Sequence, residues 1–185
     1  MITIIGGKFR GKKIKVPQRD EVRPTLNKTR EAAFNVLQNL VIFPKMTALD
    51  LYAGSGAMGL EALSRGVLQS FFVEKSPKVF QVLQKNINSF SFEKGQAVAA
   101  CRTASRWLNQ ASINEALYLI FIDPPYQSQE YEKILSRISE IPEILQNSMM
   151  VVESPIAHQF SLQNNLERIQ SKQYGQTKLD FLVKC

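Results

Sequence analysis

From residue 46 onward, short apolar runs alternate with longer amphipathic stretches, and no other feature of the 185-residue chain restricts its fold as strongly. The predicted strands lie at 47–51, 70–74, 96–100, 117–122 and 149–153. The predicted helices lie at 57–65, 77–88 and 130–138. In the second helix, apolar residues recur at the three-to-four spacing that is typical of one buried helix face. This alternation predicts an α/β fold with a mainly parallel, doubly wound sheet that is covered on both faces.

The last two predicted strands, 166–170 and 179–183, have no helix between them. Their connection contains Tyr174 and Gly175, and it favours an antiparallel hairpin. We therefore expect seven strands, with this C-terminal hairpin at one edge of the sheet.

The net charge of +7 is unevenly placed. Residues 1–45 contain ten Lys or Arg and three Asp or Glu, whereas residues 46–185 contain thirteen of each. We therefore divide the chain into a small basic extension, 1–45, and a neutral domain, 46–185. The extension is predicted to hold a β element and a helix from about residue 25 to residue 40, whose apolar face docks on the sheet. Its excess charge suits a polyanion.

Several classes of protein are disfavoured. The sequence has no run of about 18 apolar residues, so we expect no membrane span. The N-terminus lacks the basic-then-apolar order of a signal peptide. Cys101 and Cys185 have no metal-ligand spacing and His158 is the single histidine, so we expect neither a metal site nor a disulfide framework. These observations favour a cytoplasmic protein.

Gly54, Gly56 and Gly59 follow the pattern G-x-G-x-x-G directly between a predicted strand and a predicted helix. This context is that of a nucleotide-binding loop. Gly54 is expected to permit the tight turn, Gly56 to let the backbone approach a ligand, and Gly59 to let the helix pack against the strand. Glu74 ends the next strand, where its carboxylate can accept hydrogen bonds from both hydroxyls of a ribose.

Asp50 ends the strand that precedes the glycine loop. A carboxylate there is unfavourable beside the pyrophosphate of a dinucleotide, which a helix N-terminus would otherwise hold. It suits a cationic part of a ligand, such as the amino group of an amino acid. S-adenosylmethionine has both that group and a ribose, so we favour it over a nicotinamide cofactor and an oxidoreductase activity.

The most specific motif is Asp-Pro-Pro-Tyr at 123–126, which follows the fourth predicted strand. In a doubly wound sheet this strand lies beside the first, so the motif faces the glycine loop. The Asp123 carboxylate and the carbonyls of Pro124 and Pro125 offer acceptors only, because proline has no N–H. They suit the exocyclic amine of a base, and Tyr126 offers a ring on which the base can stack. The predicted reaction is methyl transfer to that amine, driven mainly by positioning and electrostatics.

Together these motifs resemble the bacterial 16S rRNA guanine-N2 methyltransferases over nearly the whole chain. The matching segments, in the family's order and roughly its spacing, are 5–11, 23–25, 29–31, 34–35, 50–66, 72–74, 123–126 and 174–177. The Asp-Pro-Pro-Tyr motif is shared with adenine-N6 methyltransferases, whereas Arg-Pro-Thr at 23–25 and Tyr-Gly-Gln-Thr at 174–177 narrow the choice. The resemblance implies a seven-stranded, Rossmann-like methyltransferase fold, S-adenosylmethionine as methyl donor, and a guanine of 16S rRNA in an assembling small ribosomal subunit as target.

We assign the site residues on these combined grounds. The catalytic residues are Asp123, Pro124, Pro125 and Tyr126. The cofactor-binding residues are Asp50, Tyr52, Ala53, Gly54, Ser55, Gly56, Glu74, Lys75 and Thr103. The RNA-binding residues are Arg10, Lys12, Lys13, Arg23, Thr25 and Arg30. Thr103 stands where the family usually has an acidic residue that contacts the adenine of the cofactor. For Arg30, the alternative to RNA binding is an ion pair with an acidic residue of the domain.

Two other functions stay open at this point. An adenine-N6 methyltransferase acting on DNA or RNA would use the same Asp-Pro-Pro-Tyr motif. A non-catalytic, basic RNA-binding assembly factor would keep the fold without the chemistry, but Asp50, Glu74 and Asp123 are all present and favour an enzyme. We expect a monomer that needs neither a metal nor a membrane.

Overall fold

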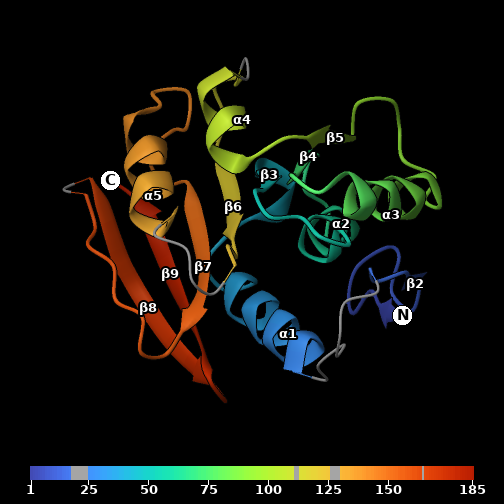
Figure 1. Cartoon of the computed structure of the whole chain (residues 1–185), viewed down its shortest axis with the longest axis horizontal. Helices are drawn as coiled ribbons and strands as arrows, with labels where there is room; N and C mark the ends of the chain where they lie inside the picture. Colours follow the sequence, from blue (N-terminus) through green and yellow to red (C-terminus); the bar gives the residue numbers. More distant parts are fainter. Residues whose placement is uncertain (18–24, 111–112, 126–129, 164) are drawn as a thin grey trace.

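The computed structural model describes residues 1–17, 25–110, 113–125, 130–163 and 165–185. Within these residues, seven strands form one sheet in the order β5-β4-β3-β6-β7-β9-β8 (Figure 1). Their bounds are β3 (Thr47–Asp50), β4 (Gln69–Glu74), β5 (Ala97–Cys101), β6 (Tyr118–Ile122), β7 (Met149–Pro155), β8 (Leu166–Tyr174) and β9 (Thr177–Lys184). Strands β3 to β7 are mutually parallel, and β9 runs antiparallel to both of its neighbours. The predicted fold class and the C-terminal hairpin are confirmed.

The C-terminal hairpin extends further than the sequence predicted. Tyr174 pairs with Thr177 across a two-residue turn, and Gly175 takes the left-handed φ of 58° that such turns favour. Most side chains of β8 are exposed because this strand lies at the edge of the sheet. The apolar pattern therefore marked only the beginning of β8.

Helices cover both faces of the sheet (Figure 1). They are α1 (Thr25–Leu37), α2 (Ala57–Ser64), α3 (Pro77–Asn88), α4 (Ala104–Gln110), α5 (Glu130–Glu140) and the 3-10 helix η1 (Phe43–Lys45). Side chains of α1, α2 and α3 join one buried apolar cluster, and side chains of α4 and α5 join a second cluster on the opposite face. The sequence did not predict α4, because its short apolar face holds only Ala104, Trp107 and Leu108.

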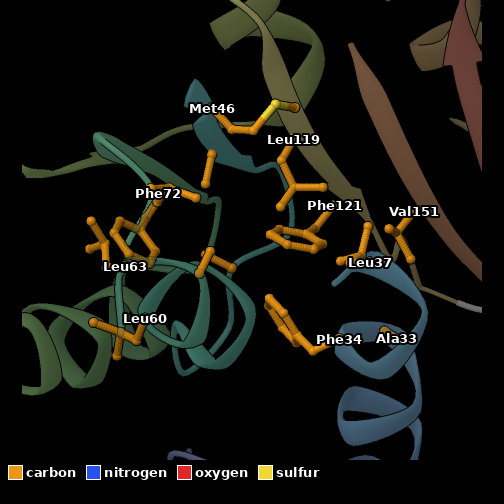
Figure 2. Close-up of a cluster of buried hydrophobic side chains, with 14 of the residues drawn as sticks. Ala33, Phe34, Leu37, Met46, Leu60, Leu63, Phe72, Leu119, Phe121 and Val151 are labelled. Atoms are coloured by element: carbon orange, nitrogen blue, oxygen red, sulfur yellow. The ribbon is translucent and has the colours of Figure 1, made fainter. Parts of the chain in front are cut away.

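The helix from the basic extension is part of the main core, as its apolar pattern predicted. In Figure 2, Phe34 and Leu37 of α1 reach the sheet near Phe121 and Val151. The Phe34 and Phe121 rings have centroids 5.7 Å apart, and all four side chains are buried. Burying a side chain of this size contributes about 1.5–3 kcal/mol. Helix α1 is therefore held to the domain mainly by apolar contacts.

The first residues of the chain also belong to this core. Strands β1 (Ile2–Thr3) and β2 (Lys13–Ile14) pair antiparallel, and Ile2, Ile4 and Ile14 are buried in the same cluster as α1. The predicted β element is thus present, although it is very short. Residues 1–17 pack on the domain through apolar side chains and are more than a charged arm.

A buried carboxylate on α2 adds polar contacts to this attachment. Glu61 is fully buried and accepts hydrogen bonds from the backbone N–H groups of Ile5 and Gly6, each at 2.8 Å. It also forms ion pairs with Arg65, at 2.9 Å, and with Arg30 of α1, at 3.9 Å. One side chain therefore joins the N-terminal segment, α1 and α2.

Candidate active site

Four adjacent parallel strands each end near a carboxylate. In the sheet order β4-β3-β6-β7, these residues are Glu74, Asp50, Asp123 and Glu153. Two positions before each carboxylate, the chain has a side chain that lies in the core beneath α1 and α2. In the same order, these core residues are Phe72, Ala48, Phe121 and Val151. Because side chains alternate between the two faces of a strand, all four carboxylates lie on this same face of the sheet.

A cavity of about 490 Å³ opens at this edge of the sheet, which is enough for a nucleotide-sized ligand. Most of the predicted cofactor-binding and catalytic residues line it: Asp50, Tyr52, Ala53, Gly54, Ser55, Glu74, Lys75, Thr103, Asp123, Pro124 and Pro125. Gly56 does not line the cavity, and Tyr126 lies outside the described residues. The structure thus brings the glycine loop and the segment 123–125 to one place, as the strand order predicted.

The three glycines of the loop are needed for different reasons. Gly54 has a φ of 53°, which suits the tight turn that was predicted. A Cβ on Gly59 would lie 2.3 Å from the Phe72 ring and 2.7 Å from the Ser70 hydroxyl, so α2 can approach β4 only because this side chain is missing. Gly56 has a second reason that the motif does not show: its φ is 84°, and a Cβ there would meet Leu83 at 2.6 Å, inside the core.

Glu74 is fixed by the backbone around it. One carboxylate oxygen accepts the N–H of Gly54 at 3.0 Å, and the other accepts the N–H of Ser76 at 2.8 Å. Each carboxylate oxygen has a second acceptor position. The side chain is therefore held at the rim of the glycine loop and can still accept hydrogen bonds from two hydroxyls.

Asp50 is a buried carboxylate among other acidic groups. Its side chain is only 4% exposed, and it accepts the N–H of Gly59 at 3.2 Å. The pKa of Asp50 is raised to about 7, mainly by desolvation and also by the nearby charges of Asp123 and Glu74, although the hydrogen bond from Gly59 opposes this rise. A positively charged ligand would stabilise the ionised carboxylate. The electrostatics of this part of the cavity thus favour a cation.

Asp123 and Glu153 are two carboxyls at neighbouring strand ends. Ile122 pairs with Val152 in the β6–β7 register, so Asp123 and Glu153 lie side by side one step beyond. Among the described residues, neither carboxyl has a hydrogen bond or an ion pair. Asp123 is exposed to the cavity, and desolvation by the protein around it raises its pKa. Desolvation and the charge of Asp123 raise the pKa of Glu153 as well. Both carboxyls are suited to a ligand that donates hydrogen bonds.

Three further polar residues at the site were missed by the sequence analysis or given another role. Tyr52 donates to Glu130 at the start of α5 at 2.9 Å, which ties α5 to the glycine loop. Burial and this bond raise the pKa of Tyr52. Thr103 lines the cavity, but its hydroxyl accepts the N–H of Arg106 at 3.2 Å and so begins α4. Glu130 could have been noticed only as an acidic residue in the first turn of a helix.

Asn86 of α3 joins the basic extension to the glycine loop. Its buried amide donates to the carbonyls of Lys15 and Ser55, both at 2.8 Å, and accepts the N–H of Lys15 at 2.9 Å. Sequence analysis did not identify this residue, because its partners lie 71 and 31 positions away. Asn86 therefore couples the position of the β2 segment to that of the glycine loop.

The predicted RNA-binding residues are in different environments. Arg10 and Lys13 are exposed. The Lys12 ammonium donates to the Ser89 carbonyl and lies 4.1 Å from the centroid of the Phe90 ring. Arg30 contradicts the expectation of a surface residue: it is 4% exposed and donates to the Thr3 carbonyl at 2.6 Å. Its ion pair with Glu61 confirms the alternative interpretation.

Two RNA-binding predictions receive no structural description. Arg23 lies outside the described residues, and so does the side chain of Thr25 at the start of α1.

In the part of the chain that the structure describes, no helix is long and apolar enough to cross a membrane. No group of three metal-ligating side chains occurs among the same residues.

Comparison with solved structures defines the class of fold. "Putative methyltransferase yhhF from Escherichia coli" matches with a TM-score of 0.84 and 30% identity, over 99% of this chain and 97% of that one. A putative methylase from Haemophilus influenzae matches with a TM-score of 0.83 and 26% identity, over 99% and 98% of the two chains. The fold is therefore the Rossmann-like methyltransferase fold.

The family follows from the sequence. The profile described as Conserved hypothetical protein 95 matches residues 2–183, so the chain belongs to that family. "Putative rRNA methyltransferase YlbH" of Bacillus subtilis is 33% identical over 153 residues, which is 82% of each chain. "Ribosomal RNA small subunit methyltransferase D" of Escherichia coli strain K12 is 33% identical over 155 residues, which is 84% of this chain and 75% of that protein.

Proposed function

We propose that this protein transfers a methyl group from S-adenosylmethionine to the exocyclic N2 amine of one guanine in 16S rRNA. The observation that carries the proposal is that the glycine loop, Asp50, Glu74 and Asp123 line the same cavity. The names of the relatives support an rRNA substrate in the small subunit. The proposal takes the protein to be a cytoplasmic monomer that acts on rRNA or on an assembling subunit without a metal.

The residues of the cavity fit S-adenosylmethionine. Asp50 offers a desolvated carboxylate to the ammonium group, and Glu74 offers two fixed oxygens to the ribose hydroxyls. Residues 52–55 and Lys75 line the same wall, and Thr103 lines the cavity at the start of α4. When bound, this cofactor supplies an electrophilic methyl group on a sulfonium ion.

The segment 123–126 is proposed to hold the amine that receives the methyl group. Asp123 and the carbonyls of Pro124 and Pro125 accept from the N2 hydrogens, which turns the nitrogen lone pair out of conjugation with the ring. Asp123 can also take the proton that the nitrogen loses, because its raised pKa makes the carboxylate a stronger base. Tyr126 is proposed to stack on the target base.

The exposed cations of the N-terminal segment are proposed to contact RNA phosphates. Arg10 and Lys13 are the described residues best placed for this role, with a partial contribution from Lys12. Arg23 and Thr25 stay in the proposal as RNA contacts. Arg30 does not, because its guanidinium is buried beside Glu61.

Methyl transfer to small subunits tests the proposal. The purified protein and labelled S-adenosylmethionine would be incubated with small subunits from cells that lack the protein, and the nucleosides identified by mass spectrometry. We expect N2-methylguanine in 16S rRNA. Formation of N6-methyladenine instead would assign the protein to the alternative enzyme class, and no transfer with normal cofactor binding would favour the assembly factor.

The Asp123→Ala variant tests the assigned chemistry. It is expected to lose about 100-fold or more of the turnover, while its affinity for S-adenosylhomocysteine stays within about threefold, since Asp123 is assigned to the amine. Glu115→Ala is the matched control, because Glu115 is exposed and does not line the cavity. Unchanged turnover in Asp123→Ala would remove this residue from the mechanism.

A further inference from the structure

The Asp-Pro-Pro-Tyr motif does not explain why a guanine would be chosen over an adenine. Both bases present an exocyclic amine, and Asp123 can accept from either. The atom next to that amine differs: guanine has the donor N1–H beside N2, whereas adenine has the acceptor N1 beside N6. A discriminating residue must therefore place an acceptor beside Asp123, where it can meet this neighbouring atom.

Glu153 brings a carboxyl to that position. The β6–β7 register sets Glu153 level with Asp123 on the neighbouring strand, and both line the cavity. Adjacent parallel strands lie about 4.8 Å apart, which is close to twice the spacing of neighbouring hydrogen-bonding groups on one base edge. Two carboxyls that converge on one edge can therefore contact N2 and N1 of the same base.

The surroundings of Glu153 indicate a ligand-facing role. Its backbone is fixed, since the Glu153 carbonyl accepts from the Tyr131 hydroxyl at 3.1 Å and the residue pairs with Leu179 of β9. Its carboxyl has neither a hydrogen bond nor an ion pair within the described part of the chain, although it is only partly exposed. Val151, two positions earlier on the same face of β7, is apolar and buried. A desolvated carboxyl without a partner is costly unless a donor arrives with the ligand.

We propose that Glu153 determines the specificity for guanine by accepting a hydrogen bond from N1–H of the target base, beside Asp123 at the N2 amine. This inference rests on the proposed function and adds a residue to it. An adenine turned to present its amine to Asp123 would bring its N1 lone pair against the Glu153 oxygen. The two acceptors would repel each other. Glu153 would therefore exclude adenine, although the Asp-Pro-Pro-Tyr motif is shared with adenine methyltransferases.

The test uses 2-aminopurine, which keeps the 2-amine of guanine but has an unprotonated N1. The target guanine would first be mapped with the wild-type enzyme. Small subunits would then be reconstituted with 16S rRNA in which splinted ligation has placed guanine or 2-aminopurine at that position. Initial rates would be measured at pH 8.5, which favours ionised Glu153, for the wild type, Glu153→Ala, Glu153→Gln and the control Glu115→Ala.

Wild type and Glu115→Ala are expected to prefer guanine by about 30-fold or more in kcat/KM, because 2-aminopurine leaves two acceptors facing each other. In Glu153→Ala the preference is expected to fall to within about threefold, with S-adenosylhomocysteine affinity unchanged in calorimetry. Glu153→Gln is also expected to lose most of the preference, since its amide can accept from guanine N1–H or donate to N1 of 2-aminopurine.

Preserved discrimination in both Glu153 variants would overturn this inference, since it would assign the preference to another group. That outcome is distinct from failure of the proposed function, in which the wild type forms no N2-methylguanine on the guanine-containing subunit. A Glu153→Ala protein that fails to fold leaves Glu153→Gln, which is nearly isosteric, to decide the question.

Discussion

Replacing Glu61 by glutamine tests how the basic N-terminal segment is attached. The substitution keeps the volume but removes the charge between Arg65 and Arg30 and one of the two oxygens that accept from Ile5 and Gly6. Removing one partner of a buried ion pair costs about 3–5 kcal/mol, and an orphaned buried donor costs about 1–3 kcal/mol. These contributions overlap, so we expect a total loss of about 3–5 kcal/mol. Domains are stable by only about 5–15 kcal/mol, so this is a large share.

Urea unfolding followed by circular dichroism measures this loss as a lower midpoint with an unchanged slope. The control is Glu140→Gln, because Glu140 is exposed and its ion pair with Arg137, at 3.5 Å, and its hydrogen bond from the Ser136 hydroxyl, at 3.2 Å, lie at the surface. Its effect is expected to stay within about 0.5 kcal/mol. Hydrogen exchange at the amides of Ile5 and Gly6 is expected to accelerate in Glu61→Gln. A Glu61→Gln protein within about 1 kcal/mol of the wild type would refute the reasoning, because the carboxylate would then not hold the segment.

Three other perturbations have defined outcomes. The ammonium group of S-adenosylhomocysteine binds the ionised form of Asp50, and the pKa of Asp50 is about 7, so the affinity measured by calorimetry is expected to rise about eightfold from pH 6 to pH 7.5. Asp50→Asn is expected to flatten this rise. A flat pH profile of the wild-type protein would contradict the assignment of Asp50. Gly59→Ala places a methyl group 2.3 Å from the Phe72 ring, so chemical denaturation is expected to show a loss of about 1–3 kcal/mol, whereas an unchanged midpoint would disprove the close packing. Arg10→Ala combined with Lys13→Ala is expected to reduce the slope of log RNA affinity against log salt by about 0.7–0.9 for each phosphate that is no longer neutralised, without changing cofactor affinity; an unchanged slope would exclude both residues from the RNA interface.

The main elements of the site could be predicted because buried parallel strands appear in the sequence as continuous apolar runs. Such runs locate the strand ends, and the strand order of a doubly wound sheet brings two of those ends together. Asp50 and Asp123 could therefore be placed in one cavity from the sequence. Glu153 could have been found by the same reasoning, because it follows an apolar run just as Glu74 does.

The remaining residues depend on contacts that local patterns do not contain. Glu61 lies in a predicted amphipathic helix, and nothing in that helix shows that its partners are 55 and 56 positions away. For the same reason Arg30 was assigned to RNA although it meets Glu61 in the core. Gly56 had the expected position in its motif, and its packing against Leu83 could not be predicted from that motif.

The attachment of residues 1–45 also affects how RNA binding can be tested. Deleting the extension would remove Ile2, Ile4, Ile14, Phe34 and Leu37 from the main apolar cluster. Loss of activity in such a truncation would therefore reflect unfolding as much as loss of charge. Substitution of exposed cations separates the two effects.

The most direct test of the proposed activity is nucleoside mass spectrometry of 16S rRNA from a strain in which this protein has been deleted. We expect one N2-methylguanine to be absent from that rRNA. The wild-type protein is expected to restore it from a plasmid, and the Asp123→Ala protein is not. An unchanged N2-methylguanine content in the deletion strain, or the loss of an N6-methyladenine in its place, would contradict the proposal.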